Sequence, residues 1–180
     1  LVVMAISGVD LALWDLRGKS RDQSIAALLA DEFDVRRPLP TYMTVFDDRA
    51  AQAAMKSRHR AIKLHVERFG DQPDPTAIAK LVEQTRERLG EDAEIMLDAF
   101  ARWDVDTTLR VAELIAPFHV TWLEEPLPPD DLHGYARLMK ASPVPIAGGE
   151  HEYLAEGFQQ LIDEKLHAVL QPDVNWCGGL

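Results

Sequence analysis

The sequence has little cysteine, fewer basic than acidic residues and no long apolar run. Cys177 is the single cysteine in 180 residues, which rules out an internal disulfide and a cysteine-based zinc site and fits a cytoplasmic protein. Nineteen Lys and Arg residues face 30 Asp and Glu residues, and the resulting net charge of −11 disfavours nucleic acid and membrane surfaces as partners. The apolar opening, Leu1 to Ile6, is too short for a signal peptide or a membrane span. The 47% of hydrophobic residues suffice for a packed core.

Both ends of the sequence look internal to a longer chain. Residue 1 is Leu rather than Met, and residues 177–180 follow an apolar run at a point where a helix ordinarily begins. We therefore expect the sequence to be a segment of a longer protein.

From residue 39 onward, short apolar runs alternate with segments of helical period. The predicted strands cover residues 39–46, 61–66, 94–99, 120–124, 145–147 and 168–171, and the predicted helices cover 50–57, 75–89, 105–116, 130–140 and 154–163. Six strands separated by helices are typical of βαβ units around a parallel sheet. Two α/β architectures fit: an open doubly wound sheet, or part of an eight-stranded barrel. No Gly-rich phosphate turn follows a strand, which disfavours a nucleotide-binding, doubly wound sheet.

The residues before 39 differ in character. Ser7 is predicted to cap a helix that ends at Gly18, and residues 25–29 are predicted to form a second short helix. We assign residues 1–38 to the end of a neighbouring domain and its junction, and residues 39–180 to the α/β domain.

Acidic residues recur at the ends of successive predicted strands. They are Asp98, Glu124, Glu150 and Asp173, at intervals of 26, 26 and 23 residues. The C-terminal ends of parallel strands meet on one face, where carboxylates would repel one another unless a cation neutralised them. An oxygen-only ligand set favours Mg²⁺ over Zn²⁺. The alternative is that each acid caps the next helix or is solvated on a loop.

Two more polar side chains lie on the strand predicted over residues 61–66. Lys63 and His65 are two residues apart and therefore face the same side of that strand. An inward lysine needs an anion, such as a metal-bound carboxylate or a developing enolate. His65 could transfer protons near neutral pH. A structural ion pair or a core position is the alternative for each.

The remaining histidines divide into two groups. His151 directly follows Glu150 and is a candidate substrate contact. The others are expected on solvated helices or loops; they are His59, His119, His133 and His167.

An ordered set of motifs spans nearly the whole sequence. It comprises residues 7–19 (SGVDLALWDLRGK), Leu97-Asp98, Trp122-Leu123-Glu124-Glu125-Pro126, Gly149-Glu150-His151, Gln171-Pro172-Asp173 and Gly178-Gly179. This set resembles the enolase superfamily, in its mandelate racemase/muconate lactonizing enzyme branch. Within the branch it is most similar to sugar acid dehydratases of the L-rhamnonate dehydratase kind.

The resemblance implies a fold, a metal and a reaction. The fold would be a partial (β/α)₈ TIM-type barrel with about six of its eight strands, preceded by the last helices of an α+β capping domain. Mg²⁺ would be held by Asp98, Glu124 and Glu150. The reaction would be a hydro-lyase dehydration of a sugar acid, in which the proton α to the carboxylate is removed, the β-hydroxyl leaves and a 2-keto-3-deoxy acid forms. Lys63 would stabilise the enediolate, and Asp173 would orient a histidine on the following strand.

Two positions depart from the family pattern. Many relatives have Lys-x-Lys where this sequence has Lys63-Leu64-His65, which argues against a two-lysine racemase and leaves His65 as an acid, a base or a substrate contact. Many relatives also have Asn where Phe100 stands, two residues after Asp98. The alternatives are a racemase or cycloisomerase of the same superfamily, and a non-catalytic barrel-derived binding protein. The resemblance also implies a small-molecule substrate and a homo-oligomer.

Overall fold

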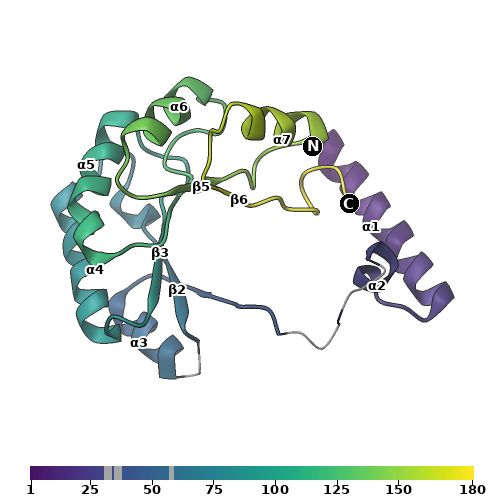
Figure 1. The fold of residues 1–180 in the computed structure, drawn as a ribbon, viewed down its shortest axis with the longest axis horizontal. Helices are drawn as coiled ribbons and strands as arrows, with labels where there is room; N and C mark the ends of the chain where they lie inside the picture. Colours follow the sequence, from purple (N-terminus) through teal and green to yellow (C-terminus); the bar gives the residue numbers. More distant parts are fainter. Residues whose placement is uncertain (31–33, 35–37, 57–58) are drawn as a thin grey trace. The chain divides into compact units, whose positions relative to one another are not determined.

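The computed structural model describes residues 1–30, 34, 38–56 and 59–180, and the chain divides into two compact units (Figure 1). The smaller unit comprises residues 1–40, 150–159 and 172–180, and the larger unit comprises residues 41–149 and 160–171. No helix among the described residues is long and apolar enough to cross a membrane.

The larger unit is built on a six-stranded parallel sheet whose strand order follows the sequence. The strands are β1 (Met43–Val45), β2 (Ala61–His65), β3 (Glu94–Asp98), β4 (Leu123–Glu124), β5 (Ile146–Gly148) and β6 (Val169–Leu170). A doubly wound sheet reverses its strand order part-way, whereas a barrel adds each new strand to the same edge. The unbroken order therefore selects the barrel architecture of the two that the sequence left open.

Helices connect the strands and lie along one side of the sheet, as Figure 1 shows for α3 to α6. The helices are α3 (Asp48–Lys56), α4 (Pro75–Leu89), α5 (Val105–Ile115), α6 (Leu132–Ala141) and α7 (Leu154–Asp163), with short 3₁₀ helices η1 (Glu67–Phe69) and η2 (Ala116–Phe118). In α4, the Asp74 carboxylate accepts a hydrogen bond from Thr76 N–H at 2.9 Å at the start of the helix, and Gly90 ends it. Fully buried apolar side chains from α4 and the strands form the core, among them Ile78, Ile62, Leu97 and Leu123.

Five of the six strands are shorter than the sequence predicted, and the difference is largest for β1, β4 and β6. β1 covers three residues of the predicted 39–46, β4 covers two of the predicted 120–124, and β6 covers two of the predicted 168–171. Hydrogen bonding to β3 nonetheless begins before β4, because Thr121 N–H donates to Ile95 O at 2.8 Å and Trp122 O accepts from Leu97 N–H at 3.0 Å. The predicted helix over 50–57 is observed as α3; Ser57 lies outside the described residues.

The smaller unit contains α1 (Val2–Arg21) and α2 (Ile25–Leu29). The prediction that Ser7 caps α1 and that Gly18 ends it was wrong, because both lie inside the helix. The Ser7 hydroxyl donates to Val3 O within α1 at 3.2 Å and accepts from Gly178 N–H at 2.8 Å. Gly18 is required where the chain folds back, since a Cβ there would lie 2.9 Å from the Gln23 carbonyl oxygen. The second helix forms as predicted.

Candidate active site

Lys63 lies between two carboxylates at the C-terminal ends of neighbouring strands. Its Nζ is 3.1 Å from Asp98 Oδ2 and donates a hydrogen bond to Glu124 Oε1. The sheet register produces this arrangement, because Asp98 pairs with Glu124 at the ends of β3 and β4. All three side chains are buried in the larger unit. Burial alone would lower the pKa of Lys63, but the hydrogen bond to Glu124 and the charge of Asp98 outweigh it and raise the pKa above the ordinary lysine value.

The second oxygen of Glu124 is held by two neutral donors. Trp122 Nε1 donates to Glu124 Oε2 at 3.1 Å, and Gln171 Nε2 donates to the same oxygen at 2.9 Å. Gln171 directly follows β6, and its own Oε1 is buried without a hydrogen-bond partner in the part of the chain that the structure describes. The sequence predicted no role for Trp122 or Gln171, which appeared only within the family motifs. The available signal was their spacing, because Trp122 stands two residues before Glu124 and Gln171 stands two residues before Asp173.

His65 occupies the end of β2, in register with Asp98. Its Nε2 is 4.0 Å from Asp98 Oδ2, which is too long for a hydrogen bond. The imidazole packs against the rings of Phe46 and Phe100. The structure therefore brings His65 to the same strand ends as Lys63, Asp98 and Glu124.

The buried Glu125 and the half-buried His167 both lie next to Gly148 of β5. Glu125 Oε1 accepts a hydrogen bond from Gly149 N–H at 3.3 Å, and the His167 ring packs on Tyr135 with centroids 4.4 Å apart. A Cβ on Gly148 would lie 2.6 Å from His167 Nε2. The prediction of a solvated His167 was therefore wrong: it enters space that the glycine leaves open, and burial lowers the pKa of His167 to about 4.

The charge balance at this end of the larger unit fits a cation. Among the described residues, the buried charged groups here are three acids, Asp98, Glu124 and Glu125, and one base, Lys63. The remaining buried base, Arg86, donates to the carbonyl oxygen of Ala93 before β3, at the other end of the strand. The excess negative charge and the oxygen-only donor set suit a hard divalent ion such as Mg²⁺.

Glu150, His151 and Asp173 belong to the smaller unit. His151 Nδ1 is 3.7 Å from Glu150 Oε1, and the His151 ring meets Trp176 edge-on with centroids 5.3 Å apart. The Asp173 carboxylate accepts hydrogen bonds from Asn175 N–H at 2.8 Å and Asn175 Nδ2 at 2.9 Å. The structure thus places Glu150 beside His151 and shows Asp173 engaged within its own loop. The roles of all seven predicted site residues stay predictions.

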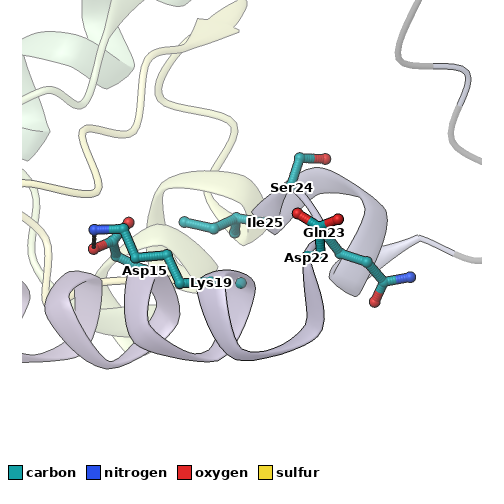
Figure 2. Close-up of a pocket in the computed structure, with 7 residues that line it drawn as sticks. Asp15, Lys19, Asp22, Gln23, Ser24 and Ile25 are labelled. Atoms are coloured by element: carbon teal, nitrogen blue, oxygen red, sulfur yellow. Dashed lines mark hydrogen bonds and ion pairs between the residues drawn. The ribbon is translucent and has the colours of Figure 1, made fainter.

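A different hollow lies at the turn between α1 and α2 (Figure 2). Asp15 and Lys19 form an ion pair of 2.7 Å there, but their side chains are 59% and 74% exposed. Such exposed pairs contribute little because water screens both charges. The buried strand-end cluster is the stronger candidate site.

Comparison with known proteins identifies the family. Residues 46–180 match the model described as enolase C-terminal domain-like, and residues 1–30 match the mandelate racemase/muconate lactonizing enzyme N-terminal domain. The chain belongs to the enolase superfamily, in its mandelate racemase/muconate lactonizing enzyme branch. Both the predicted family and the predicted partial barrel are confirmed.

The most similar relatives of this enolase superfamily chain include two kinds of enzyme. It is 37% identical to L-rhamnonate dehydratase from Saccharopolyspora erythraea, over all of this chain and 46% of the relative. It is 33% identical to D-galactarolactone cycloisomerase from Agrobacterium fabrum, over 99% of this chain and 48% of the relative. The chain therefore spans about half the length of the curated relatives it matches.

A solved structure of the superfamily supports the fold. L-talarate dehydratase from Polaromonas sp. JS666, crystallised in complex with Mg and L-glucarate, is 33% identical with a TM-score of 0.84. The match covers 99% of this chain and 50% of that one.

Proposed function

We propose that the protein carrying this chain dehydrates a sugar acid, an aldonate similar to L-rhamnonate, to a 2-keto-3-deoxy acid in a Mg²⁺-dependent reaction. The observation that carries the proposal is the buried Lys63 ammonium held between Asp98 and Glu124. The similarity to L-rhamnonate dehydratase supports the substrate class. A cytoplasmic location and a homo-oligomeric state are parts of the same proposal.

The ligand set in this proposal is Asp98, Glu124 and Glu150. The first two present buried carboxylates at adjacent strand ends, and Glu150 follows the next strand in sequence. When bound, Mg²⁺ supplies positive charge that makes the proton α to a carboxylate more acidic.

Lys63 supplies a fixed positive charge of its own. Because its pKa is raised, it stays protonated throughout the physiological range. An ammonium already held in place costs no reorganisation when negative charge develops on a substrate carboxylate, so it stabilises the transition state more than the ground state.

The remaining residues have proton-transfer and binding roles. His65 stands two residues beyond Lys63 on β2 and moves a proton to or from the substrate. His151 contacts the substrate, and Asp173 is a positioning residue for a histidine on the following strand of the family fold.

The direct test is turnover of a panel of aldonates with Mg²⁺, with the keto acid detected by semicarbazide. Glu124→Gln should abolish keto acid formation, because it removes a charged metal ligand and the negative charge that pairs with Lys63. Glu113→Gln, an exposed position on α5, is the matched control and should retain activity. Absence of keto acid from every aldonate would overturn the proposal.

Cycloisomerisation is the second candidate, favoured by the similarity to D-galactarolactone cycloisomerase. It predicts conversion of a lactone without loss of water, whereas dehydration forms a keto acid. A non-catalytic binding protein would give neither product. Mg²⁺ should raise the melting temperature of the enzyme, since a ligand that binds the folded state stabilises it.

A further inference from the structure

His65 is held at the end of β2 by aromatic rings rather than by hydrogen bonds. Its Nε2 lies beyond bonding distance of Asp98, and its Nδ1 is buried with no hydrogen-bond partner among the described residues. Phe46 and Phe100 both contact the imidazole, each with its ring centroid 5.4 Å away, at tilts of 39° and 48°. Packing against two rings therefore sets the direction of the imidazole.

Phe100 reaches His65 from a backbone conformation that phenylalanine rarely adopts. Its φ is 58°, in the left-handed region that favours glycine and asparagine. Two hydrogen bonds hold this turn: Phe100 N–H donates to Asp98 Oδ1 at 3.1 Å, and Ala101 N–H donates to Glu125 O at 2.6 Å.

Burial does not explain a phenylalanine at this position. Phe100 is 43% exposed and Phe46 is 58% exposed. Asparagine would fit the left-handed backbone with less strain. An unfavourable backbone conformation that presents an exposed ring to a candidate catalytic histidine indicates function rather than stability.

We propose that Phe100 is a positioning residue for His65. The left-handed turn after β3 presents the Phe100 ring to the imidazole, and the ring of Phe46, directly after β1, contacts it as well. Together they keep the imidazole in one orientation beside Asp98 while it moves a proton. This inference rests on the proposed function, in which His65 acts as acid or base.

Three variants of the full protein separate positioning from stability. Phe100→Asn suits the backbone but removes the ring; Phe100→Tyr keeps the ring; His119→Asn is the matched control, at an exposed residue with a φ of 53°. Phe100→Asn should keep or raise the melting temperature and lower kcat roughly 10- to 100-fold with little change in KM. Phe100→Tyr should retain kcat, and His119→Asn should leave it unchanged.

A second readout does not need turnover. The His65 ring protons lie beside two aromatic rings, whose currents shift their NMR resonances; loss of the signals in His65→Gln assigns them. In Phe100→Asn these resonances should move toward the positions of a solvent-exposed histidine. If the unmodified protein turns over no sugar acid, the proposed function fails while this shift still tests the positioning.

Three results would overturn the inference. They are His65 resonances that do not move in Phe100→Asn, a kcat that does not fall in an active enzyme, and a fall in kcat accompanied by a proportionate fall in melting temperature.

Discussion

Lys63 and Glu124 form a buried ion pair although 61 residues separate them in the sequence. The pair reaches from β2 to β4 across β3, and Asp98 at the end of β3 contributes the second carboxylate. One ammonium therefore lies between two buried acids and balances the charge of one of them. Removing Lys63 leaves both carboxylates without their cation in a poorly solvated place, which is the costly way to break a buried ion pair.

Lys63→Met should destabilise the protein by about 3–5 kcal/mol, because Asp98 and Glu124 stay buried without their cation. Urea unfolding measures this change. Mg²⁺ should recover part of the loss, since it supplies positive charge to the same carboxylates. Lys19→Met removes an exposed ion pair on α1 and is the control that should cause no measurable change. Equal stability of the two variants would contradict the compensation argument.

Trp122→Phe should weaken Mg²⁺ binding roughly 10- to 100-fold, because it removes a donor that orients Glu124 Oε2. Calorimetric titration of Mg²⁺ measures the affinity. Trp14→Phe, on α1 in the smaller unit, is the matched control and should bind Mg²⁺ normally. Equal affinities for Trp122→Phe and the unmodified protein would show that the Trp122 hydrogen bond does not prepare Glu124 for the metal.

Local sequence patterns predicted the order of strands and helices well, because apolar period and capping residues act over a few positions. The helix over 75–89 is observed with the predicted bounds, since Pro75 and Gly90 mark both of its ends. Ser7 misled the prediction because a serine before an apolar run resembles a cap; in the structure its hydroxyl bonds back into α1 at Val3. The choice between a barrel and an open sheet depends on strand order, which no local pattern encodes.

The candidate site was predictable where it depends on strand alternation, as for Lys63 and His65. Contacts between side chains from elements that are distant in the sequence could not be predicted in this way. The ring of Phe100 contacts His65 from a backbone with a φ of 58°, and the half-buried His167 lies where a Cβ on Gly148 would stand. A glycine in a strand signals close approach of another group but does not name that group.

Gly148→Ala should destabilise the protein by about 1–3 kcal/mol through overpacking, since its Cβ would lie 2.6 Å from His167 Nε2 and 2.8 Å from His167 Cδ2. The combined variant Gly148→Ala/His167→Ala should be less destabilised than the sum of the two single changes, because removing the imidazole frees the space. Urea unfolding of all four proteins gives the coupling. Strict additivity would show that the two residues do not oppose each other.

His167 should make the protein less stable as the pH falls from 6.5 toward 4. Its pKa is lowered by burial from 6.5 to about 4, so in this window the unfolded state takes up a proton that the folded state does not. The free energy of unfolding should therefore fall by up to about 3 kcal/mol over the window, and the full contribution should be present above pH 6.5.

The difference between the unmodified protein and His167→Gln isolates this effect, because every other titrating group is common to both. Urea unfolding at a series of pH values should give two curves that run parallel above pH 6.5 and converge or cross as the pH falls to 4, with the variant losing less stability. His119→Gln removes an exposed histidine and should follow the unmodified protein throughout. Curves that stay parallel across the whole range would mean that His167 takes up its proton equally in the folded and unfolded states, and that its contact with Tyr135 and Gly148 does not exclude the charged form.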